Sequence, residues 1–122
     1  MVVLYQHDIT GAPLEELYNN LQTETGHEAA PFTRLEAEGV LERRDEIDAL
    51  IDTASRAWPA HRMAALERNI LRIGVYELRH RPDIPKEVTI DEAVQLAKRF
   101  CSREAAALVN GILGKTAEEG QT

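Results

Sequence analysis

The sequence has little of what disulfide-stabilised, metal-binding or membrane-spanning proteins require. Of its 122 residues only Cys101 is a cysteine, which excludes an internal disulfide and a multi-cysteine metal site. Aromatic residues make up 5% of the chain, and no apolar run approaches the roughly 18 residues of a membrane span. No basic and apolar leader resembles a signal peptide. We therefore expect a cytoplasmic protein whose residues 1–122 form one domain.

Catalytic motifs are also missing. No glycine-rich phosphate loop follows a strand, because no stretch shows the alternation typical of strands. Cys101 has no nucleophile signature around it and is expected to pack as a small hydrophobe. The histidines lack the i, i+4 pairing of helical metal sites: His7, His27, His61 and His80. The sequence predicts a binding module rather than an enzyme, with no cofactor.

The negative charge is distributed unevenly. The net charge is −7, but residues 1–58 carry 12 acidic and 4 basic side chains, whereas residues 59–122 carry 9 acidic and 10 basic ones. The basic residues of the second half are either available to an anionic partner or paired with local glutamates. The acidic residues of the first half are expected only to keep the domain in solution: Glu36, Glu38, Glu42, Asp45, Glu46, Asp48 and Asp52.

The stretch Arg68–Cys101 organises the chain. Apolar residues at three- and four-residue steps from Leu66 to Leu78 share one helix face, and Leu71 and Val75 widen it. Such a wide apolar face predicts a buried central helix. Gly74 lowers the helix propensity by about 1 kcal/mol relative to alanine, so we expect a neighbouring helix to approach closely there.

The first half of the chain predicts shorter helices. Residues 1–7 have the pattern of the last turns of a helix, followed by a loop over residues 8–13. Pro13 suits the first position of a short helix that ends at Gly26. Apolar spacing predicts a long helix from Phe32 to Trp58, with a possible bend at residues 43–45.

Two helices are predicted after the corner at residues 82–85. Thr89 and Glu92 have the form of a capping box, and Phe100 is expected to face inward with Ala93, Leu96 and Ala97. Ser102 is a plausible cap for the last helix, whose tail over residues 116–122 is expected to fray. The chain as a whole predicts an all-α, single-domain bundle of six or seven helices.

Several separated blocks of the second half resemble the NusB family of transcription antitermination factors. They keep the family's order and spacing: Leu66–Leu78, Ile84–Pro85, Ile90–Lys98 and Leu108–Leu113. The resemblance implies an all-helical, NusB-like factor that binds the boxA element of ribosomal RNA operon leaders. It also implies a protein partner, NusE, which is a small-subunit ribosomal protein. Together they help RNA polymerase, in its antitermination complex, to pass termination signals while it transcribes ribosomal RNA.

The resemblance also implies two sets of contact residues. One set is expected to bind RNA: Tyr5, Lys98, Arg99, Ser102, Arg103 and Glu104. The other set is expected to bind the partner: Glu67, Arg72, Asp83, Ile84, Lys86 and Val88. Two structural alternatives stay open, since Tyr5 could belong to the core and Arg72 could be buried against Glu67 or Glu77.

Family members usually begin with an arginine-rich segment, whereas this sequence starts near the point where that segment ends. We therefore expect a truncated first helix and weakened RNA binding. Two alternative functions stay open. The chain could be the NusB-like domain of a ribosomal RNA cytosine methyltransferase, or a helical interaction scaffold without RNA binding. A monomer and a homodimer are both compatible with the sequence.

Overall fold

The computed structural model describes residues 2–25, 31–55 and 58–119. Within these residues it contains seven α-helices, one 3-10 turn and no strand, which confirms the all-α prediction. None of the described helices is long and apolar enough to cross a membrane. The elements are α1 (Val2–Thr10), α2 (Leu14–Thr25), α3 (Pro31–Glu42), α4 (Arg44–Ala54), η1 (Ala60–Arg62), α5 (Ala65–His80), α6 (Lys86–Phe100) and α7 (Arg103–Glu119).

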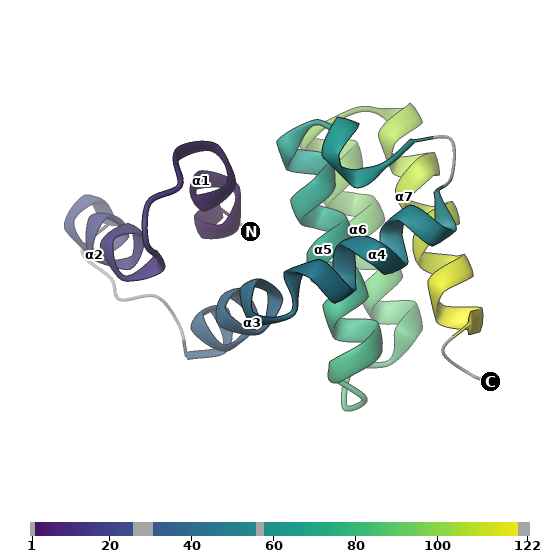
Figure 1. Cartoon of the computed structure of the whole chain (residues 1–122), viewed down its shortest axis with the longest axis horizontal. Helices are drawn as coiled ribbons and strands as arrows, with labels where there is room; N and C mark the ends of the chain where they lie inside the picture. Colours follow the sequence, from purple (N-terminus) through teal and green to yellow (C-terminus); the bar gives the residue numbers. More distant parts are fainter. Residues whose placement is uncertain (1, 26–30, 56–57, 120–122) are drawn as a thin grey trace.

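Helix α5 is the centre of the arrangement. It packs against α1, α3, α4, α6 and α7, while α6 and α7 also pack against each other. Figure 1 shows α5, α6 and α7 alongside one another, with α4 crossing them and the α1–α2 pair at the left of the view, above α3. The middle of α5 is accordingly buried, with Ile70, Leu71 and Val75 at most 1% exposed. The prediction of a buried central helix is confirmed.

Close approach of a neighbouring helix explains Gly74. A Cβ atom placed on Gly74 would lie 2.8 Å from Cδ1 of Leu113, which belongs to α7. Such a distance is well below van der Waals contact, so a side chain at this position would force the buried Leu113 side chain or the helices to shift. The expected close contact at Gly74 is therefore confirmed.

The helix boundaries of the first half differ from the prediction in three places. Helix α1 continues to Thr10, so the loop predicted over residues 8–13 begins only at Gly11. Gly11 has a φ of +73° and its N–H donates to His7 O, an arrangement typical of a helix C-terminus. The helix predicted from Phe32 to Trp58 breaks at Arg43, within the segment where the sequence allows a bend, and ends at Ala54 rather than Trp58. The predicted end of the second helix, Gly26, lies outside the described residues.

The boundaries of the last two helices also need correction. Helix α6 begins at Lys86, with Pro85 preceding it, so Thr89 lies within the helix and the predicted capping box is wrong. The fixed φ of proline suits a helix start. The hydroxyl of Thr89 instead donates to Glu77 Oε1 at 2.9 Å, which ties α6 to α5. Helix α7 continues to Glu119 and Thr116 is buried, so the predicted fraying does not begin at residue 116.

Several of the acidic residues assigned to solvent have structural partners, among them Asp52, Asp48 and Glu36. Asp52 Oδ1 accepts the N–H of Ala60 at the start of η1, at 2.7 Å. Asp48 binds Arg72, and Glu36 faces Glu77 in the interior. The prediction of a purely solvated acidic face is therefore wrong for these three residues.

Candidate nucleic-acid interface

The corner between α6 and α7 forms around a helix cap at Ser102. The N–H of Ala105 donates to Ser102 Oγ at 3.0 Å, and the N–H of Ala106 donates to Ser102 O at the same distance. The predicted cap is thus confirmed. The start of a 17-residue helix carries the positive end of the helix dipole, so the corner favours negative charge.

A hollow of about 270 Å³ lies on one side of this corner and is formed by three elements. Tyr5 comes from α1, residues 64–67 from the start of α5, and residues 100–102 from the corner itself. Two residues predicted to bind RNA, Tyr5 and Ser102, thus line the same hollow although 97 positions separate them in the sequence. Glu67, which was predicted to bind a protein partner, lies in this hollow with them.

Phe100 faces this hollow and not the core. Its side chain is 45% exposed, so the prediction that it faces inward is wrong. It is the last residue of α6, directly before the corner that leads into α7. The guanidinium carbon of Arg99 lies 5.1 Å from the centre of the Phe100 ring, a cation–π contact. The exposed Phe100 ring therefore borders the hollow, and Arg99 lies against that ring.

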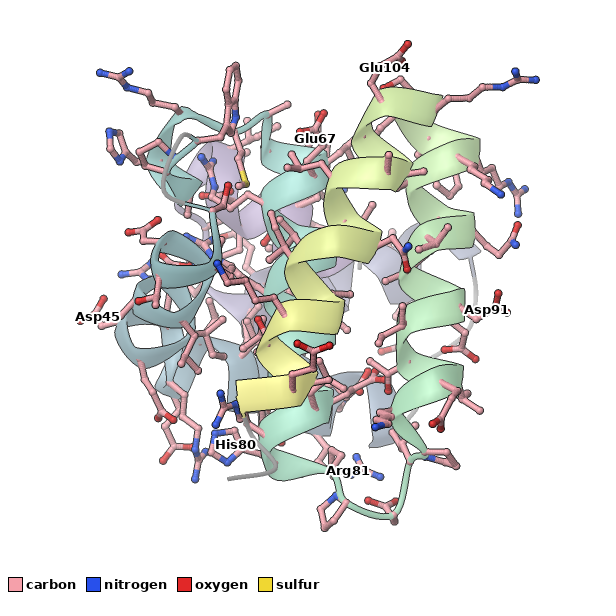
Figure 2. All side chains as sticks on the ribbon, turned by 90° about the vertical axis from the view of Figure 1, so that its right-hand side faces the viewer. Asp45, Glu67, His80, Arg81, Asp91 and Glu104 are labelled. Atoms are coloured by element: carbon pink, nitrogen blue, oxygen red, sulfur yellow. The ribbon has the colours of Figure 1, made fainter. Side chains whose placement is uncertain are left out.

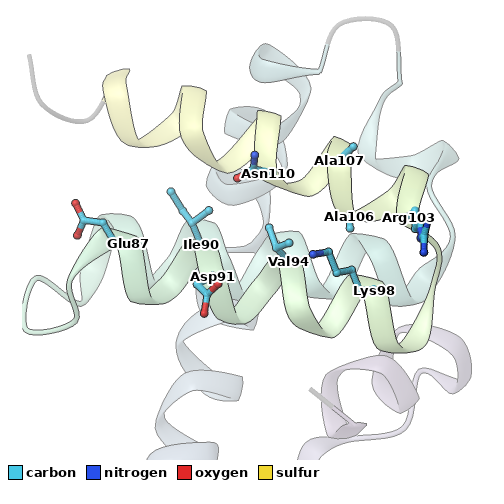
Figure 3. Close-up of a pocket in the computed structure, with 9 residues that line it drawn as sticks. All are labelled: Glu87, Ile90, Asp91, Val94, Lys98, Arg103, Ala106, Ala107 and Asn110. Carbon is cyan, nitrogen blue, oxygen red and sulfur yellow. The ribbon is translucent and has the colours of Figure 1, made fainter.

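A groove of about 560 Å³ lies on the other side of the corner, between α6 and α7. Lys98 and Arg103 flank its end nearest the corner, while Glu87 and Asp91 lie toward its far end. Figure 3 shows Ile90 and Val94 pointing toward α7 along the groove, with the Lys98 amine directed over Val94. The predicted RNA residues thus lie on both sides of the corner. Lys98 and Arg103 line the groove, whereas Tyr5 and Ser102 line the hollow.

The sequence model of the NusB family matches residues 1–118.

The chain belongs to the NusB family.

The transcription antitermination protein NusB of Rubrobacter xylanophilus is 41% identical over 111 residues, which are 91% of this chain and 79% of that protein. The solved structure of T. maritima NusB covers 96% of this chain and 84% of that chain, with 36% identity and a TM-score of 0.84. A crystal structure of the antitermination factors NusB and NusE in complex with dsRNA covers 96% of this chain and 89% of that chain, with 25% identity and a TM-score of 0.84. The family match and the names of these relatives indicate no catalytic family.

In this NusB-family chain the residues predicted to bind a partner fall into two places. Glu67 lies in the first turn of α5, whereas four other members lie at the corner between α5 and α6. Helix α5 places Glu67 about 20 Å from His80, at 1.5 Å per residue. Figure 2 shows Glu67 at the same end of the molecule as Glu104, with Arg81 at the opposite end. The members at the α5–α6 corner are Asp83, Ile84, Lys86 and Val88.

At that corner Asp83 is held by Arg81. The Arg81 guanidinium donates to both carboxylate oxygens, at 3.1 and 3.0 Å. The hydrogen bonds from Arg81 hold the pKa of Asp83 below its ordinary value. Val88 is 45% exposed beside it, so the α5–α6 corner combines charged groups with an exposed apolar side chain.

Arg72 is buried in an ion-pair network. Its side chain is 8% exposed, and its Nε and Nη2 donate to Asp48 Oδ1 and Oδ2, each at 2.8 Å. Arg72 is therefore buried, but the carboxylate that it pairs with is Asp48 of α4 and not Glu67 or Glu77. A further contact at 3.7 Å joins Arg72 to Asp8. These ion pairs account for Arg72 without a bound protein, and its contact with one stays a prediction.

No group of three or more histidine, cysteine or acidic side chains is arranged to hold a metal ion within the described part of the chain. Cys101 is half-buried against the core. Burial, with the nearby Glu67 carboxylate, raises the pKa of the Cys101 thiol, which disfavours its reactive thiolate form.

Proposed function

We propose that this chain is a transcription antitermination factor that binds boxA-type leader RNA together with NusE, the small-subunit ribosomal protein. In this role it promotes transcription of ribosomal RNA by RNA polymerase in the cytoplasm. Membership of a family whose curated members are named antitermination proteins supports the proposal. The observation that carries RNA binding is the basic, capped corner between α6 and α7, which opens on a hollow lined by the exposed Phe100 and the half-buried Tyr5.

The chemistry of this corner fits a phosphate backbone. Lys98, Arg99 and Arg103 are all exposed, and they come from the last turn of α6 and the first turn of α7. Arginine and lysine at a helix start bind phosphates through charge and amide hydrogen bonds, which position a strand without reading its bases. Much of the affinity for RNA arises in this way, through release of counterions.

The neighbouring hollow supplies what single-stranded RNA needs in addition. Unpaired bases bind proteins by stacking on aromatic rings and by hydrogen bonds at their edges. Tyr5 and Phe100 provide aromatic surface there, and Ser102 and Glu67 provide polar atoms. Basic groups beside an aromatic hollow are the combination expected for a single strand that crosses the corner.

The proposed surface for NusE is the α5–α6 corner at the opposite end of the bundle. Its exposed residues include the apolar Val88 and the charged Asp83 and Lys86, a mixture typical of protein interfaces. Since α5 separates this corner from the basic one by its whole length, changes at one end should leave the other intact.

The test uses the double variant Lys98→Ala/Arg103→Ala. We expect weaker binding to boxA RNA and to unrelated single strands alike, with the salt slope reduced by about 1.4 for two lost phosphate contacts. The matched control is Arg44→Ala/Lys115→Ala, which also removes two exposed positive charges but away from the corner. Binding to NusE and the melting temperature should be unchanged in both variants.

Three other results would contradict parts of the proposal. Normal RNA binding with loss of NusE binding in the Lys98/Arg103 variant would mean that the two surfaces are reversed. Binding of NusE but of no RNA by the parent chain would make it an interaction scaffold. Equal loss of RNA affinity in the variant and its control would show that total charge, and not the corner, governs binding.

A further inference from the structure

We propose that the hollow beside the α6–α7 corner binds one guanine base of a single-stranded RNA, and that the Glu67 carboxylate reads the edge of that base. The inference rests on the proposed function, because it names the base that one part of the RNA surface accepts. It assigns Glu67 to the RNA and not to the protein partner.

The hollow has the form of a base site. Its walls come from α1, α5 and the α6–α7 corner, and its volume of about 270 Å³ leaves room for one base. Phe100 contributes a ring that is 45% exposed and Tyr5 a second, half-buried ring. Unpaired bases bind proteins by stacking on such aromatic rings. A base bound here would cover apolar surface that otherwise faces water.

Glu67 is available to a ligand. It is half-buried in the first turn of α5, and no hydrogen bond or ion pair engages its carboxylate within the described residues. The adjacent Arg68 is turned away toward Asp8, which it contacts at 2.6 Å. The Glu67 charge also acts on a residue that lines the hollow, Cys101. Burial is the main cause of the raised pKa of Cys101, and the Glu67 carboxylate is the second cause.

The identity of the base follows from hydrogen-bond complementarity. An ionised carboxylate only accepts hydrogen bonds, and it has two oxygens side by side. Guanine presents two adjacent donors on its Watson–Crick edge, the N1–H and the N2 amine. Adenine, cytosine and uracil each place an acceptor next to a donor, so the second carboxylate oxygen would face a lone pair. Guanine is the one standard base that satisfies both oxygens.

The surroundings favour a nucleic acid over a protein segment. Arg99 lies over the Phe100 ring, and Lys98 and Arg103 lie around the same corner, so the RNA backbone of a bound base would meet positive charge. Ser102 Oγ accepts from the N–H of Ala105, which leaves its hydroxyl hydrogen to donate to a base oxygen. The carbonyl O6 of guanine lies next to N1 and suits such a donor.

The experiment measures binding of fluorescent 12-residue oligouridine strands that carry one guanosine, inosine or adenosine at the same central position. At about 50 mM salt, where phosphate contacts are strong, we expect the guanosine strand to bind about tenfold tighter than the adenosine strand. Inosine lacks the N2 amine and should fall between them. The variant Glu67→Gln should lose the preference for guanosine while it binds plain oligouridine at least as tightly as the parent.

Two further variants separate base reading from the rest of the interface. Phe100→Leu should weaken binding of all strands, because it removes the stacking ring but leaves Glu67 in place. Lys98→Ala/Arg103→Ala should weaken all strands but keep the ratio between guanosine and adenosine. Melting curves of each variant should match the parent, since these side chains are exposed or half-exposed.

The outcomes distinguish this inference from the proposed function. Tight but equal binding of all three strands would overturn the guanine site and leave RNA binding intact. A preserved preference for guanosine in Glu67→Gln, with loss of NusE binding, would return Glu67 to the partner surface. Binding of no strand by the folded parent would overturn the proposed function and the guanine site together.

Discussion

Two carboxyl groups, Glu36 and Glu77, meet inside the bundle where α3 packs against α5. Burial and the neighbouring Glu77 raise the pKa of Glu36 from its ordinary 4.5 to about 8. Glu77 is 7% exposed and accepts a hydrogen bond from Thr89, whereas the buried Oε1 of Glu36 has no hydrogen-bond partner among the described residues. Glu36 therefore keeps its proton at neutral pH, because two adjacent buried carboxylates cannot both be ionised at little cost.

The raised pKa of Glu36 makes stability depend on pH. Because the folded state holds this proton more tightly than the unfolded state, the contribution is complete below about pH 4.5 and is lost as pH rises through 8. Glu36→Gln keeps an uncharged side chain at every pH. We expect this variant to match the parent in urea denaturation near pH 5 and to exceed it increasingly toward pH 9.

A matched control for this prediction is Glu38→Gln, on the exposed side of the same helix. Its stability should follow the parent across the same pH range. Parallel pH profiles for the parent and Glu36→Gln would contradict the interior carboxyl pair.

Among the helices, the α5–α7 contact shows how one residue sets a distance between elements. Gly74 of α5 is buried and faces Leu113 of α7, which belongs to the main hydrophobic core. Two other glycines, Gly111 and Gly114, lie within α7 where an added Cβ would meet no atom within 4 Å. The same residue type is thus tightly packed at Gly74 and open to substitution at Gly111 and Gly114.

The substitution Gly74→Ala should destabilise the protein by about 1–3 kcal/mol through overpacking. Gly111→Ala should have the opposite effect and stabilise the protein by about 1 kcal/mol, since it improves helix propensity without a clash. Thermal or urea denaturation of the two single variants measures the difference. Equal gains in both variants would show that α5 and α7 do not meet closely at Gly74.

At the scale of the whole molecule, an ion-pair network ties the first helix to the centre. Asp8 of α1 accepts hydrogen bonds from Arg68 at 2.9 and 2.6 Å and from Asn69 at 3.0 Å, both residues of α5. Arg72 continues the network to Asp48 on α4. Burial alone would raise the pKa of Asp8, but the Arg68 hydrogen bonds and charge outweigh it and lower the pKa.

We expect Asp8→Asn to lower the stability by roughly 2–4 kcal/mol at pH 7, because it leaves partly buried guanidinium groups without their carboxylate. The lowered pKa means that this stabilisation is present at neutral pH and is lost as pH falls below about 4. The difference from the parent in urea denaturation should therefore shrink toward pH 3.

Asp45→Asn, at an exposed position of α4, is the control for the loss of one acidic side chain. It should change the stability little at either pH. A deficit in Asp8→Asn that is the same at pH 3 and pH 7 would mean that its charge is not what joins α1 to α5.

The sequence by itself determined the helices, the burial of α5 and the cap at Ser102. Each depends on residues within a few positions of one another, since helical periodicity and capping act over one or two turns. The close approach at Gly74 was also predictable, because a glycine inside an apolar helix implies a neighbour. The boundaries at Thr10 and Lys86 were not, because prolines and polar residues near a helix end fit either a loop or a helix turn.

Only the tertiary structure decided which charged groups meet. Asp8 and Arg68 are 60 positions apart, and Asp48 and Arg72 are 24 apart, so their pairing follows from how α1 and α4 cross α5. The same holds for the hollow, which brings Tyr5, Glu67 and Phe100 together from three helices. Ion pairs and binding hollows depend on distances between elements, and helix packing sets those distances while local sequence patterns do not.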